Sequence, residues 1–340
     1  MNKAQTAIAQ GLLETPKKIV IVGHKNPDGD AVGSTSALSL FLKSQGHDTQ
    51  VIVPNDFPDF LKWMPASEDI LIYNQKVEQA NQLIKDADII CTLDFNSFTR
   101  VGSMEDALTQ ATADYIMIDH HESPSDYAVL TYSDTAMGST CEMVYHFIEA
   151  MGQLEYVSEA MATNMYTGIM TDTGSFRFAS TTATTHRVIA GLMDAGAVHH
   201  KIHENIYDSS SPERLKLLGI ALKNMRILPE YKTAYITLSQ KELDENHFKK
   251  GDTEGFVNYA LSIKGIIFAA IFIEHKKDNI IKMSLRSKGD FSVNLVSREH
   301  FHGGGHHNAA GGKSDLNLTE TIRYFISILP QYKDQLLAHA

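Results

Sequence analysis

The chain has 340 residues, of which 43% are hydrophobic, enough for two domains with separate cores. Its 41 acidic and 30 basic side chains give a formal net charge of −11, which argues against a surface that binds long nucleic acids. Two cysteines, Cys91 and Cys141, are too few for a disulfide framework and are expected to be buried thiols. No signal-peptide pattern or bilayer-length apolar run occurs, so we expect a cytoplasmic protein that does not contact membranes.

Short apolar runs alternate with helical patterns in the first half of the chain. The predicted strands are residues 18–22, 49–53, 88–93 and 115–118, and the predicted helices between them are residues 32–44 and 77–85. This alternation is typical of a parallel sheet with helices on both faces. Ligands of such sheets bind beyond the carboxyl ends of the strands, where the polar residues of this chain also gather.

The second half begins with helical patterns and ends with a new group of strands. Residues 139–225 are predicted to be mainly helical, with a break at residues 209–212 that precedes a helix at residues 213–225. The later predicted elements are strands at residues 233–238, 265–274 and 279–285 and helices at residues 293–299 and 319–328. We therefore predict an α/β protein with a parallel-sheet domain at residues 1–208, a connector helix within residues 209–228 and a smaller α/β domain at residues 229–340.

Oxygen and imidazole ligands follow four separate segments of the first half. They are His24, Asp28, Asp30, Asp94, Asp119, His120, His121 and Asp172. Four segments that each supply such ligands indicate a pair of divalent cations, because one side chain cannot fill two coordination shells. Carboxylates suit Mn²⁺ or Mg²⁺, imidazole favours Mn²⁺, and the set contains no thiolate that would favour zinc. The sequence predicts a two-metal hydrolase.

A glycine-rich segment at residues 303–312 distinguishes the second domain. Consecutive glycines cost backbone entropy, and they permit main-chain N–H groups to approach an anion closely. Arg286 and His306 add a fork-shaped donor and an imidazole, so this domain is expected to bind a terminal phosphate. Arg100, six residues after Asp94, is a further candidate phosphate ligand, with a surface salt bridge as the alternative.

The motifs together resemble those of a known family. His24-x-x-x-Asp28-x-Asp30, Leu93-Asp94, Asp119-His120-His121 and Thr171-Asp172-Thr173-Gly174 resemble, in order, the four motifs of the DHH phosphoesterase family. The segment at residues 303–312 is similar to the signature of the DHH-associated C-terminal domain. The resemblance covers residues 15–335, and it is closest to the branch of oligoribonucleases and pAp phosphatases, the nanoRNases.

The resemblance implies a role for each candidate residue. One metal, usually Mn²⁺, would be held by His24, Asp28 and Asp94. The other would be held by Asp30, Asp94, His120 and Asp172, so that Asp94 bridges both. Asp119 would orient a histidine, and His121 would act on the substrate as a phosphate ligand or a proton donor. The substrate-binding residues of the second domain would be Arg286, Ser287, Gly304, Gly305 and His306.

The implied activity is that of a Mn²⁺-dependent phosphoesterase, with Mg²⁺ as the alternative metal. It would hydrolyse RNAs of two to five nucleotides to mononucleotides and remove a phosphate from pAp, in a cleft between the two domains. The acidic charge balance agrees with short substrates, because an enzyme of long strands would carry a basic track or an OB-fold. The direction of RNA attack and a homodimeric assembly are left open.

Three other functions use overlapping features. A phosphodiesterase of linear or cyclic dinucleotides, such as pGpG, pApA or cyclic di-AMP, would use the same first-domain motifs. A soluble pyrophosphatase shares those motifs, but its second domain carries lysine-rich clamps in place of Arg286 and the glycine segment. A non-catalytic nucleotide-binding regulator would not need enough carboxylates to bind two metal ions, so the complete ligand set argues against this function.

Overall fold

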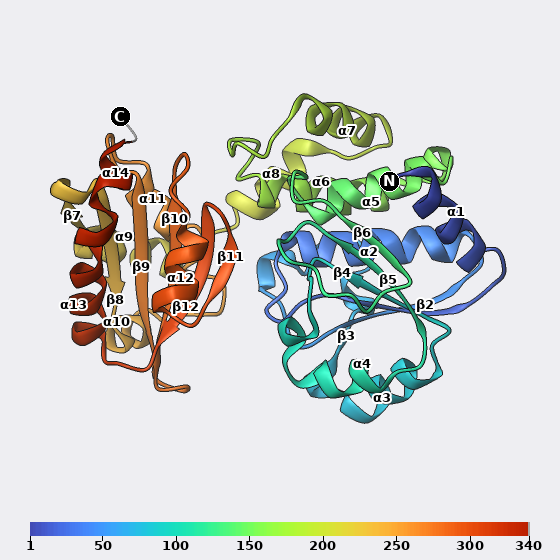
Figure 1. Cartoon of the computed structure of the whole chain (residues 1–340), viewed down its shortest axis with the longest axis horizontal. Helices are drawn as coiled ribbons and strands as arrows, with labels where there is room; N and C mark the ends of the chain where they lie inside the picture. The colour runs from blue at the N-terminus through green and yellow to red at the C-terminus, as the bar shows by residue number, and fades with distance from the viewer. Residues whose placement is uncertain (339–340) are drawn as a thin grey trace. The chain divides into compact units, whose positions relative to one another are not determined.

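The computed structural model describes residues 1–338, and the chain divides after Ser209 into two compact units (Figure 1). Each unit has its own sheet of six strands and its own hydrophobic core. Within residues 1–338, every helix is too short or too polar to traverse a bilayer. The predicted α/β class is confirmed.

The first unit is built on a fully parallel sheet with the strand order β3-β2-β1-β4-β5-β6. The strands are β1 (Lys18–Val22), β2 (Asp48–Val53), β3 (Leu71–Ile72), β4 (Ile89–Leu93), β5 (Asp114–Asp119) and β6 (Leu130–Ser133). The predicted strands correspond to β1, β2, β4 and β5, whereas the short edge strands β3 and β6 were missed because they lack a long apolar run. The strand order reverses between β1 and β4, and sheets of this kind bind ligands at that point.

Helices cover both faces of this sheet, as Figure 1 shows. The core on one face contains residues of α1 (Lys3–Leu12), α2 (Gly29–Ser44), α5 (Thr140–Ala150), α6 (Glu159–Asp172), α7 (Ala183–Asp194) and α8 (His199–Tyr207). The core on the other face contains residues of α3 (Val77–Asp86) and α4 (Glu105–Gln110). Strand side chains alternate between the two cores, so that Ile19 and Ile21 enter the first and Val20 and Val22 the second.

Helices α2 and α6 pack unusually closely because glycines lie at their contact. A Cβ atom on Gly29 would lie 2.5 Å from Thr171 Oγ1, and one on Gly33 would lie 2.6 Å from the carbonyl oxygen of Asn164. A Cβ atom on Gly168 would lie 2.2 Å from Cys141 Sγ on α5. The close approach brings the start of α2 next to the end of α6, where two of the predicted metal ligands are found.

The second unit has a mixed sheet with the order β11-β12-β10-β9-β8-β7. Its strands are β7 (Arg226–Leu228), β8 (Thr233–Leu238), β9 (Phe268–His275), β10 (Ile280–Ser287), β11 (Gly304–His306) and β12 (Ala309–Ser314). Only β8 and β9 pair in parallel within the described part of this sheet. Its helices are α9 (Pro212–Asn224), α10 (Gln240–Glu245), α11 (Phe256–Leu261), α12 (Val293–His300), α13 (Leu318–Ile328) and α14 (Lys333–Ala338).

Helix α9 and the glycine-rich segment both pack closely within this unit. Helix α9, predicted at residues 213–225, begins at Pro212 and packs Leu217 and Ala221 into the core of the second unit. The glycine-rich segment forms a hairpin of β11 and β12. A Cβ atom on Gly303 would lie 1.9 Å from the carbonyl oxygen of Gly311, so close strand packing is one reason for these glycines.

Candidate metal centre

The six predicted metal ligands lie together in the first unit, in two groups. The first group is His24, Asp28 and Asp94, and the second is Asp30, His120 and Asp172. Within each group, one ligand atom of every residue lies within 4.8 Å of those of the others. They follow β1, β4 and β5 or lie at the ends of α2 and α6, so the fold gathers four distant segments at the point where the strand order reverses.

Asp94 links the two groups. Its Oδ2 atom lies 3.2 Å from His24 Nε2, and its Oδ1 atom lies 3.5 Å from His120 Nε2. Its φ angle of 64° is left-handed, a conformation that Asp adopts more readily than most residues. Thr140 Oγ1 donates a hydrogen bond of 3.2 Å to Oδ1, which fixes the carboxylate. Each carboxylate oxygen therefore faces a different histidine.

His24 and His120 are held in the same way. Nδ1 of His24 lies 2.9 Å from the carbonyl oxygen of Lys25, and Nδ1 of His120 lies 3.2 Å from that of Met137. With Nδ1 as the donor, the Nε2 lone pair of each neutral ring is directed toward the carboxylates, as in metal-ligating histidines. His120 Nε2 lies 3.3 Å from Asp172 Oδ2, which joins α6 to this site.

His121 is held differently, although it follows His120 directly. Its Nδ1 atom lies 2.7 Å from Asp119 Oδ1, and its main-chain N–H donates a 3.1 Å hydrogen bond to Asp119 Oδ2. Asp119 is fully buried, so this carboxylate fixes the His121 ring. Asp119 was expected to orient a histidine, and the structure pairs it with His121.

Asp28 caps the helix that carries Asp30. Its Oδ1 atom accepts 3.1 Å hydrogen bonds from the main-chain N–H groups of both Asp30 and Ala31, which defines the start of α2. Its Oδ2 atom lies 3.8 Å from His24 Nε2, and 57% of its side chain is exposed. One oxygen is therefore structural, while the other faces the first group of ligands.

Asp30 is fully buried and is held by the start of α5. Its carboxylate accepts hydrogen bonds of 2.6 Å from the Thr140 N–H and 2.8 Å from the Cys141 N–H. A helix N-terminus stabilises a negative charge in this position. No motif in the sequence indicates this contact. The signal of the helix start, Ser139 three residues before Glu142, is visible in the sequence, but its pairing with Asp30 is not.

The electrostatics of the site favour a bound cation. Burial and the charge of Asp94 raise the pKa of Asp30 to about 7, and burial and the charge of Asp30 raise the pKa of Asp172 well above its usual value. Burial by itself lowers the pKa of His120, but the hydrogen bond to Asp94 and the charges of Asp172, Asp94 and Asp30 raise it to about 10. These shifts express the cost of packing four carboxylates together, which divalent cations would offset.

The donor set fits a hard or borderline divalent cation. Its ligand atoms are carboxylate oxygens and imidazole nitrogens, which suit Mn²⁺ and also Mg²⁺. The thiol of Cys141 is close by, but burial and the charge of Asp30 raise its pKa well above the usual value. The Cys141 thiol is therefore neutral and packs next to Gly33 and Gly168.

Arg100 is the predicted phosphate ligand in the first unit. It lies in a 3₁₀ segment (Phe98–Met104) after β4, and its carbonyl oxygen accepts a 2.8 Å hydrogen bond from the N–H of Lys25, next to His24. Burial lowers the pKa of His121, and the positive charge of Arg100 acts in the same direction. The structure thus brings Arg100 near both His24 and His121.

The predicted substrate-binding residues of the second unit fall into two kinds. Arg286 and His306 both pair with Ala309, one on either side, so they belong to one cross-strand row. Gly304 and Gly305 precede His306 in β11. Ser287 differs, because its hydroxyl already donates a 2.5 Å hydrogen bond to the carbonyl oxygen of Phe291 and accepts one of 2.9 Å from Asn308 Nδ2.

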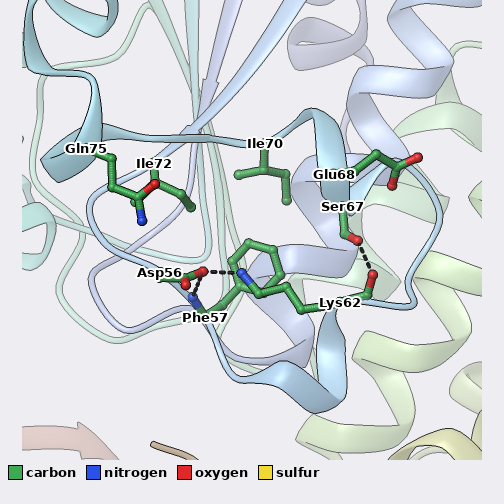
Figure 2. A pocket seen from close by; sticks show the side chains of 8 residues that line it. All are labelled: Asp56, Phe57, Lys62, Ser67, Glu68, Ile70, Ile72 and Gln75. Atoms are coloured by element: carbon green, nitrogen blue, oxygen red, sulfur yellow. Dashed lines mark hydrogen bonds and ion pairs between the residues drawn. The ribbon is translucent and has the colours of Figure 1, made fainter.

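A surface pocket of about 290 Å³ in the first unit contains none of the predicted site residues (Figure 2). It is lined by Asp56, Phe57, Lys62, Ser67, Glu68, Ile70, Ile72 and Gln75. The Lys62 amino group pairs with the Asp56 carboxylate and lies 3.8 Å from the centre of the Phe57 ring, so its charge is already compensated. The pocket is separate from the candidate metal centre.

The parallel sheet and the buried histidine and aspartate groups define a metal-dependent hydrolase. Residues 18–169 match the DHH family, N-terminal domain, and residues 231–331 match the DHHA1 domain. The chain therefore belongs to the DHH/DHHA1 family of metal-dependent phosphoesterases.

Relatives of this chain have several described activities. A bifunctional oligoribonuclease and PAP phosphatase, NrnA of Thermus thermophilus, is 29% identical over 89% of this chain and 86% of its own length. The cyclic-di-AMP phosphodiesterase GdpP of Geobacillus thermodenitrificans is 26% identical over 94% of this chain, but this chain spans only 48% of it. An exopolyphosphatase-related protein from Bacteroides fragilis has a crystal structure that matches with a TM-score of 0.94, at 42% identity and 98% coverage of both chains.

Proposed function

We propose that this protein is a Mn²⁺-dependent phosphoesterase that hydrolyses RNAs of two to five nucleotides to mononucleotides and removes a phosphate from pAp. The observation that carries the proposal is the pair of ligand groups joined through Asp94, with His121 held beside them by Asp119. The similarity to the NrnA protein of Thermus thermophilus over most of both chains supports the substrate class.

His24, Asp28 and Asp94 would hold one divalent cation, and Asp30, Asp94, His120 and Asp172 would hold the other. Bound divalent cations supply Lewis-acid polarisation of the phosphoryl oxygens and lower the pKa of water. The protein residues keep the two imidazoles oriented through their Nδ1 bonds, and the α5 N-terminus holds the Asp30 side chain in place.

His121 and Arg100 would act on the substrate. Because Asp119 engages Nδ1 of His121, the proton that moves to or from a substrate oxygen is carried at Nε2. A phosphate beside His121 would raise its pKa and so favour the proton-donating form. Arg100 would neutralise a phosphate oxygen with its fixed charge.

The second unit would bind the terminal phosphate. Arg286 offers a bidentate donor for phosphate oxygens, and His306 lies in the same cross-strand row. Gly304 and Gly305 leave the β11 backbone without side chains next to His306. Ser287 would contribute by keeping Asn308 and the segment before α12 in place, since its hydroxyl is engaged with both.

A cyclic or linear dinucleotide phosphodiesterase is the second candidate function. The 26% identity to GdpP over 94% of this chain favours it, because the match covers both units. Cyclic di-AMP has no terminal phosphate, so a cyclic substrate would leave Arg286 and His306 without their proposed ligand, whereas a linear dinucleotide such as pGpG would not.

A substrate panel tests the proposal. Purified protein with Mn²⁺, and separately with Mg²⁺, would be assayed on pAp, pGpG, 5′-labelled RNAs of two, five and 24 nucleotides, cyclic di-AMP and pyrophosphate. We expect the highest kcat/KM on the two- and five-nucleotide RNAs, measurable release of phosphate from pAp, and higher rates with Mn²⁺. Equal rates on the dinucleotide and the 24-mer, or a clear preference for cyclic di-AMP or pyrophosphate, would refute it.

A further inference from the structure

The segment directly after Asp172 has an uncommon backbone conformation. Gly174, Ser175 and Phe176 have consecutive φ angles of 58°, 61° and 64°. Two of these three residues carry a Cβ atom, and such residues rarely adopt left-handed angles except where the surrounding structure imposes them, often at functional sites.

Thr173 imposes this conformation. It is fully buried, and its carbonyl oxygen accepts hydrogen bonds from the N–H groups of Arg177 at 3.0 Å and Phe178 at 3.1 Å. Its hydroxyl accepts a third, of 3.1 Å, from the N–H of Phe176. A turn fixed by three bonds to one buried residue presents its outer side chains in a defined position.

The turn sorts its side chains into inner and outer ones. Phe176 packs against the core of the first unit, with its ring centre 5.9 Å from that of Tyr166. Arg177 and Phe178 are exposed, Phe178 to 38%. The Phe178 ring rests on the backbone of Gly174, where an added Cβ atom would lie 2.5 Å from Phe178 Cζ. The absence of a side chain at Gly174 therefore makes room for the Phe178 ring.

Both ends of the segment adjoin the candidate metal centre. Its first residue, Thr173, follows Asp172 directly. At its other end, the carbonyl oxygen of Ser180 lies 3.3 Å from the position of a Cβ atom on Gly138. Gly138 follows Met137, whose carbonyl oxygen holds Nδ1 of His120. The exposed ring is therefore carried by a turn tied to the residues that hold the second ligand group.

We propose that Phe178 is a stacking platform for a nucleobase of the substrate. An aromatic ring stacks with any base, so it would bind nucleotides without sequence preference. Arg177 extends the binding surface toward a phosphate of the same substrate, because its Nε atom is fixed by a 2.7 Å bond to the carbonyl oxygen of Gly174 and, among the described residues, the structure gives it no ion pair. This inference rests on the proposed function and deepens it. It predicts selection for nucleotides over substrates that contain only phosphate.

Two substitutions separate stacking from packing. Phe178→Leu keeps an apolar side chain on Gly174 but has no aromatic face, whereas Phe178→Trp keeps the face. The substrates are pApA and its abasic analogue, which has the same phosphates and sugars without the adenines. We expect Phe178→Leu to lower kcat/KM on pApA by roughly 5- to 150-fold, the range for loss of one stacked base, with little change on the abasic analogue. Phe178→Trp should retain activity on pApA.

A control and a second readout complete the test. Tyr156, in a short 3₁₀ turn (Leu154–Tyr156), is also exposed, to 51%. Tyr156→Leu should leave kcat/KM unchanged on both pApA and the abasic analogue. A non-hydrolysable dinucleotide with 2-aminopurine should lose fluorescence on binding to the wild type, because stacking quenches it, and should lose less on binding to Phe178→Leu.

The outcomes distinguish the two proposals. Equal losses on pApA and the abasic analogue, or unchanged quenching with Phe178→Leu, would overturn the platform and leave the phosphoesterase function standing. Quenching that depends on Phe178 in a protein that hydrolyses none of the nucleotides would support the platform and overturn the proposed function.

Discussion

The adjacent histidines His120 and His121 differ in what holds their Nδ1 atoms. A main-chain carbonyl holds that of His120, and the buried carboxylate of Asp119 holds that of His121. The Asp119 carboxylate opposes the burial that lowers the pKa of His121, which suits a group that must gain and lose a proton. A carbonyl partner fixes a neutral ring whose Nε2 atom can bind a cation. We propose that these two partners give the same residue type two different roles.

The first prediction separates these roles. His121→Ala should lower kcat by roughly 10²- to 10⁴-fold, the usual contribution of a general acid or base, while the metal content stays near that of the wild type. His120→Ala should instead lower the metal content. Elemental analysis of both variants, together with steady-state kinetics, checks this. Loss of one metal equivalent from His121→Ala would mean that the two roles have been interchanged.

The second prediction concerns Asp94, which faces both ligand groups. Asp94→Asn is the informative change, because Asn also tolerates the left-handed φ angle of 64° and still accepts the bond from Thr140. We expect kcat to fall at least roughly 100-fold through loss of the shared negative charge, with the circular dichroism spectrum unchanged. Asp59→Asn, at an exposed site in the same unit, is the control. Activity within tenfold of the wild type under saturating Mn²⁺ would contradict a bridging role.

The helices α2, α5 and α6 place the ligands through close contacts between small residues. Gly33 and Gly168 leave room for the Cys141 side chain between the helices, and Asp30 Oδ1 would lie 2.8 Å from a Cβ atom on Gly168. Interiors are packed too densely to absorb an extra methyl group without movement. Packing at this contact and positioning of Asp30 are therefore coupled.

The third prediction tests that coupling. Gly168→Ala should destabilise the protein by roughly 1–3 kcal/mol through overpacking and should lower activity by displacing Asp30. Cys141→Ala in the same background should recover part of the lost stability and part of the lost activity, because it removes the Sγ atom that lies 2.2 Å from the new methyl group. Thermal unfolding and kinetics of the single and double variants measure this.

Gly11→Ala supplies the matched control for Gly168→Ala. Gly11 lies in α1 with no atom within 4 Å of its added Cβ position, so alanine should be neutral or stabilise the helix by up to about 1 kcal/mol. If both alanine variants behaved alike, helix propensity and not crowding would explain the effect.

The protein as a whole consists of two units with different kinds of sheet. The parallel sheet of the first unit gathers the ends of distant strands at one edge, which suits a site built from many segments. The mixed sheet of the second unit instead aligns side chains in cross-strand rows, such as that of Arg286, Ala309 and His306. We propose that the first unit binds the metals and that the second unit binds a phosphate group.

The fourth prediction follows for the second unit. Arg286→Ala and His306→Ala should each lower kcat/KM on substrates with a terminal phosphate by roughly ten- to a hundredfold, the effect of one lost charge-assisted contact. Hydrolysis of bis-p-nitrophenyl phosphate and the metal content should change little. Lys313→Ala, at an exposed position in the neighbouring strand β12, is the control. Equal losses on both substrates would show that these residues do not recognise a terminal phosphate.

The sequence by itself determined the features that local patterns encode. Apolar runs marked the central strands, because a buried parallel strand needs side chains that pack on both faces. The acidic and imidazole residues after these runs marked the edge of the sheet where the ligands gather, since the carboxyl ends of parallel strands lie on one side. Pro212 marked the start of α9 in the same local way.

Only the tertiary structure decided which of these residues meet. The bond of Asp30 to the α5 N-terminus joins positions about 110 residues apart in the chain, and no local pattern carries that information. The partner of His120 was likewise set by where Met137 lies in space. The glycine segment formed a hairpin because its backbone can approach Gly311 and Ala309 closely. Contacts between distant segments depend on how the whole sheet and its helices pack, which residue types and spacing along the chain do not specify.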